Sequence, residues 1–115
     1  MREDFFDNWT VQVRKGVLEL CIMHALQNGE RYGYELVKSL VAVPGVQVAE
    51  GSIYPLLTRL KRHGFVETRL VESNEGPARK YYSLTKSGRK QSRAMQTYFG
   101  SLVEGMHTLN NGAKK

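Results

Sequence analysis

The sequence predicts a fold of the α+β class that is mostly α, and three observations lead to this expectation. Residues 51–63 place apolar side chains on one side of a helix and arginines and small polar groups on the other. Residues 65–84 have the pattern of two strands joined by a turn rich in Ser, Asn, Gly and Pro. Two helical patterns precede this unit and a longer one follows it. A short helix followed directly by a hairpin is the layout of a winged helix-turn-helix, here extended by a C-terminal dimerisation helix.

The length of 115 residues corresponds to one domain with a modest core. We expect the winged helix-turn-helix to occupy residues 1–84, the C-terminal helix residues 85–109, and a disordered tail residues 110–115. All apolar stretches are too short to span a bilayer, and the chain opens with acidic residues, unlike a signal peptide. A single cysteine, Cys21, cannot form an internal disulfide. These features predict a cytoplasmic protein with no membrane partner.

The first two helices are predicted from apolar residues at helical spacing. The first covers residues 11–27 and stops at Gln27-Asn28-Gly29. The second runs from Gly33 to about Val41, before Pro44-Gly45 breaks it. The positions expected to be buried are Val11, Val17, Leu18, Cys21, Ile22, Ala25 and Leu26 in the first helix, and Leu36, Val37, Leu40 and Val41 in the second.

The third helix, within residues 51–63, has two different faces. Its apolar face consists of Ile53, Leu56, Leu57 and Leu60, and its polar face of Pro55, Thr58, Arg59 and Arg62. The sequence is consistent with two start positions for this helix. Ser52 as the N-cap would place Pro55 in the first turn, where the missing N–H costs little, whereas a start near Glu50 would distort the helix at Pro55.

The hairpin that follows has strands at residues 65–71 and 79–84, joined by Ser73-Asn74-Glu75-Gly76-Pro77. In the first strand Val66, Thr68 and Leu70 share one face. In the second strand Tyr81 and Tyr82 point to opposite faces, so we expect one of them to lie in the core. Thr85 is the predicted N-cap of the last helix.

The last helix carries a long apolar stripe with heptad spacing, which Tyr98 and Val103 widen. The stripe either folds back onto the domain or forms a dimer contact. We favour the dimer, because a small winged helix has little core left to absorb so many large side chains, and because the N-terminal segment 1–10 adds exposed aromatic residues. The predicted dimerisation residues are Phe5, Phe6, Trp9, Met95, Tyr98, Phe99, Leu102, Met106 and Leu109.

The charge distribution indicates a nucleic-acid partner. The net charge is +6, and residues 51–93 hold 10 Lys/Arg and 3 Asp/Glu, whereas residues 1–50 hold 5 Lys/Arg and 7 Asp/Glu. The basic excess therefore lies on the third helix, the hairpin and the start of the last helix. Clustered cations displace counterions from phosphates, although a basic solvated face is the alternative.

The exposed side chains of the third helix are candidates for reading duplex DNA. Arg59 and Arg62 can donate to phosphate or to guanine O6 and N7. The hydroxyls of Ser52, Tyr54 and Thr58 can reach phosphates or base edges, and Tyr54 can equally be a packing residue.

The hairpin tip supplies a second group of candidates. Arg79 and Lys80 follow the Gly-Pro turn and can enter the minor groove. Because they alternate faces, one of them alone is expected to make the contact. Arg69 is a weaker candidate.

Four ordered motifs within residues 14–90 resemble the PadR family of bacterial transcriptional regulators. They are Lys15-Gly16-Val17-Leu18-Glu19-Leu20, Gly29-Glu30-Arg31-Tyr32-Gly33-Tyr34-Glu35-Leu36, Glu50-Gly51-Ser52-Ile53-Tyr54-Pro55-Leu56-Leu57-Thr58-Arg59-Leu60 and Gly76-Pro77-Ala78-Arg79-Lys80-Tyr81-Tyr82-Ser83-Leu84-Thr85-Lys86-Ser87-Gly88. The resemblance implies a homodimeric repressor of the short form, bound to an operator and often released by a small molecule. It also implies a place near the DNA backbone for Tyr34, with core packing as the alternative.

Some short members of that family bind flat aromatic compounds in a cavity at the dimer interface. This chain has no Trp in its C-terminal helix, which departs from that pattern. The residues that would line such a cavity here are Trp9, Tyr98 and Phe99.

Catalysis is not predicted. Cys21 and His24 lie three residues apart on an apolar helix, but no second Cys or His cluster completes a metal site, and no cofactor motif is present. Two alternatives to a DNA-binding regulator remain: a winged helix used for protein–protein contact, and an RNA binder. The basic helix and hairpin argue against the first, and the narrow major groove of RNA argues against the second.

Overall fold

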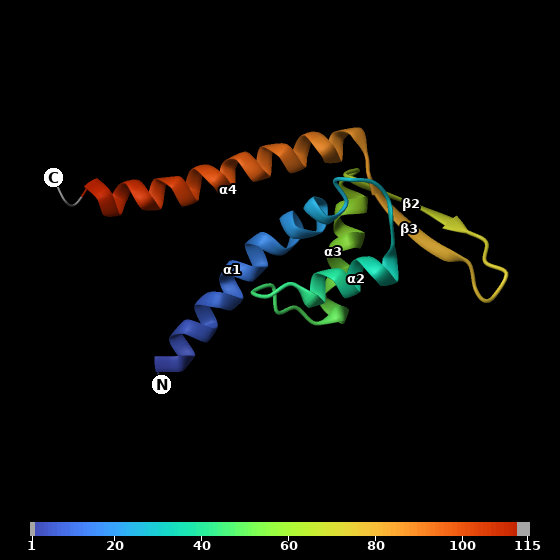
Figure 1. Cartoon of the computed structure of the whole chain (residues 1–115), viewed down its shortest axis with the longest axis horizontal. Coiled ribbons are helices and arrows are strands. Elements are labelled where there is room, and N and C mark those ends of the chain that lie inside the picture. The colour runs from blue at the N-terminus through green and yellow to red at the C-terminus, as the bar shows by residue number, and fades with distance from the viewer. Residues whose placement is uncertain (1, 113–115) are drawn as a thin grey trace.

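A computed structural model describes residues 2–112 as four helices around one small sheet (Figure 1). The elements run α1 (Arg2–Ala25), β1 (Arg31–Tyr32), α2 (Gly33–Ala42), α3 (Glu50–Arg62), β2 (Val66–Val71), β3 (Arg79–Leu84) and α4 (Lys86–Gly112). The predicted α+β, mostly α, winged helix-turn-helix is therefore confirmed. In Figure 1, α3 lies between α1 and the β2–β3 hairpin, and α4 extends away from the domain as a long rod.

The sheet has the order β1-β3-β2, and both pairings are antiparallel. β2 and β3 form the predicted hairpin, which is the wing, and their register places Val66 opposite Leu84. β1 was not predicted, because a two-residue strand has no periodicity to recognise. It pairs Arg31 with Tyr82 and Tyr32 with Tyr81, which ties the start of α2 to the wing.

The core lies where α1, α2 and α3 meet the inner face of the sheet. Of the two tyrosines on β3, Tyr82 is the core residue and Tyr81 is half-buried, as the alternation predicts. Two positions expected to be buried are exposed: Val11 lies beyond the domain on α1, and Val41 lies in the last turn of α2. The buried apolar side chains are Leu18, Ile22, Met23, Leu26, Leu36, Val37, Leu40, Ile53, Leu57, Leu60, Val66, Tyr82 and Leu84.

α3 begins at Glu50, which decides the start left open by the sequence. Its N-cap is Ala49, so Ser52 is a helical residue rather than the cap, and Pro55 lies inside the helix. The Ser52 N–H donates to the Ala49 carbonyl at 3.0 Å, a tight first turn. The alternative with Ser52 as the cap is therefore wrong.

α4 starts as predicted and ends later than predicted. The Thr85 hydroxyl accepts from the Gly88 N–H at 2.9 Å and donates to the Gly64 carbonyl at 2.6 Å, so Thr85 both caps α4 and anchors it to the end of α3. The helix continues through residues 110–112, which corrects the predicted start of the tail. Residues 113–115 of that predicted tail lie outside the described residues.

α1 begins at Arg2, well before the predicted residue 11, so the described part of the segment 1–10 is helical. Phe5, Phe6 and Trp9 are exposed on it, and the rings of Phe6 and Trp9 lie 6.1 Å apart between centroids. The first turns of α1 therefore carry aromatic surface that the rest of the domain does not cover.

Candidate nucleic-acid interface

The exposed face of α3 is the centre of the candidate site. Ile53 and Leu57 are buried against the domain, with 0% and 1% exposure, and this fixes the rotation of the helix about its axis. Thr58 and Arg62 then lie in the middle of the exposed arc, and Pro55 lies beside them. The two faces predicted from the sequence are those of the structure.

One flank of α3 borders a cleft of about 500 Å³ beneath the wing tip, which we term the wing-side cleft. Its lining includes Tyr34 from α2, Tyr54 from α3, and Arg79 and Lys80 from β3. Tyr34 and Tyr54 are 53% and 44% exposed, so core packing, the alternative for Tyr34, is wrong, and Tyr54 lies outside the core. The structure thus brings together four of the side chains that the sequence singled out.

The strand register separates the two cations of the wing tip. Lys80 pairs with Leu70, on the face that carries the buried Tyr82 and looks towards α3. Arg79 is on the outer face, where its guanidinium carbon lies 4.7 Å from the centroid of the Tyr32 ring. The predicted alternation is confirmed, and Lys80 is the cation on the α3 side of the wing.

Arg69, the weaker candidate for a DNA contact, forms a salt bridge with Glu30. Its Nε donates to the Glu30 carboxylate at 2.9 Å, and a second N–H of the same guanidinium donates to the other carboxylate oxygen. The hydrogen bond from Arg69 lowers the pKa of the Glu30 carboxyl group. The guanidinium carbon also lies 5.7 Å from the Tyr81 ring centroid. Arg69 therefore lies on the outer face of the wing, and the Glu30 carboxylate offsets its positive charge.

The other flank of α3 borders a second cleft of about 520 Å³, formed with α1, which we term the α1-side cleft. Its lining includes Arg14, Lys15, Ser52 and Arg59. The Arg59 Nε lies 3.4 Å from a carboxylate oxygen of Glu19 on α1. Local periodicity does not predict this pair, because its two residues lie on different helices. The Arg14-Lys15 pair is a basic spot within an otherwise acidic first half, and it is the one feature of the sequence that points to this flank.

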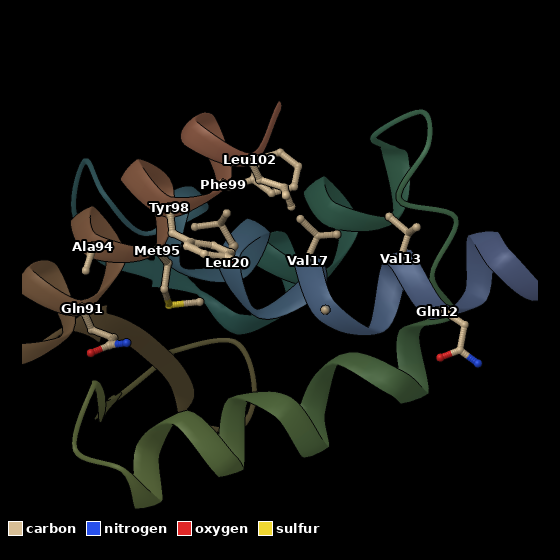
Figure 2. A pocket seen from close by; sticks show the side chains of 11 residues that line it. Gln12, Val13, Val17, Leu20, Gln91, Ala94, Met95, Tyr98, Phe99 and Leu102 are labelled. Carbon is tan, nitrogen blue, oxygen red and sulfur yellow. The ribbon is translucent and has the colours of Figure 1, made fainter. Parts of the chain in front are cut away.

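A separate apolar groove of about 590 Å³ lies between α1 and α4, which we term the α1–α4 groove (Figure 2). Figure 2 shows side chains of α4 facing Val17 and Leu20 of α1 across it. Of the predicted stripe, Met95, Tyr98, Phe99 and Leu102 line the groove. Met106 and Leu109 lie further along α4 and are exposed. Trp9 does not line the groove, so the three residues predicted to line a ligand cavity are not all brought together.

Within residues 2–112, no group of three or more His, Cys, Asp or Glu side chains could hold a metal ion. Burial raises the pKa of the half-buried Cys21 thiol, which makes it a poor nucleophile. No helix in the described part of the chain is both long and apolar enough to cross a membrane.

An exposed basic helix set between two clefts, with a basic hairpin beside it, defines a winged-helix DNA-binding protein. The model of the transcriptional regulator PadR-like family matches residues 22–94, and the chain belongs to that family.

Individual relatives agree with this assignment. The transcriptional regulator Rv3488 of Mycobacterium tuberculosis is 31% identical over 108 residues, which cover 88% of this chain and 97% of that protein. The crystal structure of a PadR-like transcriptional regulator from Bacillus cereus matches with a TM-score of 0.75 at 40% identity, over 85% of this chain and 95% of that chain. The crystal structure of Bacillus subtilis PadR in complex with operator DNA matches with a TM-score of 0.62 at 29% identity, over 70% of this chain and 46% of that chain. The protein is thus a transcriptional regulator rather than an enzyme.

Proposed function

We propose that the protein is a homodimeric repressor that binds a pseudo-palindromic operator through α3 and the wing. The observation that carries the proposal is the position of α3, whose exposed arc is flanked by the wing-side cleft with its tyrosines and cations. That Bacillus subtilis PadR is known in complex with operator DNA supports it. Occupation of the operator would exclude polymerase and repress transcription.

We assign base reading to the centre of the exposed arc. Thr58 and Arg62 lie there, and an arginine reads guanine by donating to both O6 and N7. Arg59 is paired with Glu19 on the flank of the helix, so we assign it to phosphate rather than to a base.

We assign the wing-side cleft to the DNA backbone. Tyr34 and Tyr54 are exposed side chains that carry hydroxyls, and Lys80 adds a cation on the same side. Arg79, whose guanidinium lies over the Tyr32 ring, is the candidate for the minor groove next to the tip, so we assign DNA contacts to both wing-tip cations rather than to one alone.

The dimer is proposed from the apolar surface of α4 and α1. Phe99 and Leu102 line the α1–α4 groove but stay 41% and 48% exposed, and Leu109 is 77% exposed. A second copy that lays its own α4 against this surface would cover these side chains, together with Phe5, Phe6 and Trp9. A two-fold dimer would place two α3 helices in successive major grooves, about 34–36 Å apart.

An effector is proposed for the same groove. A flat aromatic molecule held between Tyr98 and Phe99 would displace α4 relative to α1 and change the separation of the two wings. If the effector binds the DNA-free dimer more tightly than the DNA-bound dimer, it would weaken operator binding by the ratio of those two affinities. Acting on DNA, the protein would work in the cytoplasm.

The test is fluorescence-anisotropy binding to the DNA upstream of the protein's own gene, against a scrambled duplex, over a salt series. We expect a preference that persists at about 150 mM salt, where non-specific affinity is typically only about 10⁻⁴–10⁻⁶ M. Arg62→Ala should lower operator affinity by about 1–3 kcal/mol with little effect on the scrambled duplex. Equal binding of the wild-type protein to both duplexes, lost together as salt rises, would favour a winged helix used for protein–protein contact.

Sedimentation velocity tests the dimer. We expect the wild-type protein to sediment as a dimer, and Leu102→Asp to shift it to monomer, because a carboxylate would be buried in the apolar contact. The matched variant Ser101→Asp, exposed on the same helix but absent from the groove lining, should leave the dimer intact. A monomeric wild-type protein at micromolar concentration would contradict the assignment.

A further inference from the structure

The α1-side cleft gathers three cations from elements far apart in the chain. Arg14 and Lys15 come from α1, and Arg59 comes from α3. The Arg14 guanidinium donates to the Gln47 side-chain carbonyl at 3.2 Å, which holds it against the loop that leads into α3. Glu19 is the acidic group that pairs with this cluster, so positive charge remains in excess.

We propose that the α1-side cleft is a second phosphate-binding surface. It contacts the phosphates of the DNA strand that runs along the flank of α3 opposite the wing. This inference rests on the proposed function, since it requires α3 to lie in a major groove. It assigns DNA contacts to Arg14 and Lys15, which lie on α1, outside both α3 and the wing.

The rotation of α3 places the two clefts on opposite sides of the helix. At about 100° per residue, Tyr54 and Ser52 lie on opposite flanks, with Thr58 and Arg62 between them. Tyr54 lines the wing-side cleft and Ser52 lines the α1-side cleft. A helix inserted in a major groove has a phosphate strand along each flank. The two clefts therefore lie where the two strands would run, as the position of α3 between α1 and the wing in Figure 1 illustrates.

Glu19 acts as a positioning residue for Arg59. Its side chain is 19% exposed, whereas that of Arg59 is 56% exposed, so the carboxylate is the fixed partner and the guanidinium the outer one. The pairing uses Nε and holds the guanidinium beside the cleft, away from the centre of the exposed arc. A guanidinium has five N–H donors, which leaves donors available for a phosphate.

The start of α3 adds to the electrostatics of the cleft. The N-cap residue Ala49 and Ser52 from the first turn line it, no side chain caps the helix there, and Glu50 is the acidic residue of that turn. The first N–H groups of a helix carry a partial positive charge that favours an anion. The α1–α4 groove involves the opposite side of α1, with Val13 and Val17, so a dimer contact leaves the cleft accessible.

The experiment measures the salt dependence of DNA binding for Arg14→Gln/Lys15→Gln. Each phosphate contact contributes about 0.9 to the slope of log affinity against log salt concentration, so the slope should become shallower by about 1.8. The affinities for the operator and for a scrambled duplex should fall by the same factor, because phosphates carry no sequence. The matched control is Lys90→Gln/Arg93→Gln, which removes the same charge from exposed positions on α4 outside both clefts and should keep the wild-type slope.

Arg14→Gln removes a hydrogen bond to Gln47, so Lys15→Gln alone is measured as well. It should make the slope shallower by about 0.9 while the melting temperature is unchanged. A wild-type slope in both cleft variants, or an equal change in the α4 control, would overturn the inference and leave the proposed function standing. A wild-type protein with no affinity for either duplex would overturn the proposed function itself.

Discussion

Gly88, the third residue of α4, has no room for a side chain. A Cβ atom added there would lie 2.0 Å from the carbonyl oxygen of Phe65, 2.9 Å from its carbonyl carbon and 3.1 Å from its Cα. All three atoms belong to backbone that is fixed on both sides. The Phe65 carbonyl accepts from the Thr85 N–H at 3.0 Å, and the Phe65 N–H donates to the Leu60 carbonyl at 3.0 Å. Gly88→Ala must therefore move either α4 or the junction of α3 with β2.

The expected cost follows from this geometry. Overpacking of a filled site costs about 1–3 kcal/mol, and we expect about 3 kcal/mol because neither backbone segment can rotate away. Replacing a glycine by alanine within a helix stabilises the helix by about 1 kcal/mol, because alanine has the higher helix propensity. The net loss of about 2 kcal/mol corresponds to a fall of about 8 °C in melting temperature for a domain of this size.

Thermal unfolding followed by circular dichroism measures this effect, with all variants at one protein concentration because a dimer melts in a concentration-dependent way. Gly100→Ala is the matched control on the same helix, where an added Cβ meets nothing within 4 Å. It should raise stability by about 0.5–1 kcal/mol. If Gly88→Ala melts at or above the wild-type temperature, the close approach of α4 to Phe65 is not a constraint and the reasoning is refuted.

Three further changes have definite expected outcomes. Leu57→Ala should lower the free energy of unfolding by about 2–5 kcal/mol in urea titrations, because Leu57 is 1% exposed in the core, whereas Leu70→Ala, at a position 67% exposed, should change it little. Burial, and secondarily the charge of Tyr54, raise the pKa of the Tyr82 phenol, so the fold favours the neutral form. The stabilisation from the neutral Tyr82 phenol is complete below its unfolded-state pKa of about 10 and is lost as the pH rises above that pKa. Tyr82→Phe should remove this loss of stability in thermal melts at high pH. Equal losses in the wild-type protein and the variant would contradict the prediction. The Cys21 thiol, with its raised pKa, should react with Ellman's reagent at pH 8 more slowly than free cysteine, and a faster reaction would show that the thiol is not shielded.

Local signals in the sequence predicted most of the elements correctly. The apolar spacing of residues 51–63 fixed which face of α3 is buried, and the alternation of Tyr81 and Tyr82 fixed which one enters the core. Thr85 was recognisable as a cap because its partner lies three residues away. Such features depend on neighbours within one turn or one strand, so they can be read from a single sequence.

The errors have a common physical origin. Ser52 is a good capping residue, but α3 starts earlier because packing of the helix, not the capping preference, decides where it begins. Val41 has the right periodicity to be buried but lies where α2 leaves the domain. Local preference is a weak term, and tertiary packing overrides it at the ends of elements.

The sequence by itself determined that this chain is a winged helix of the PadR-like family with an amphipathic α3, because burial patterns and motifs are written in local order. Only the tertiary structure decided which charged side chains meet across elements. The pairs Glu19 with Arg59 and Glu30 with Arg69 join residues far apart in the chain, and each places a carboxylate beside an arginine that was a candidate for DNA contact. Whether two charges meet across elements depends on the angles at which the elements pack, and periodicity along one chain segment does not encode those angles.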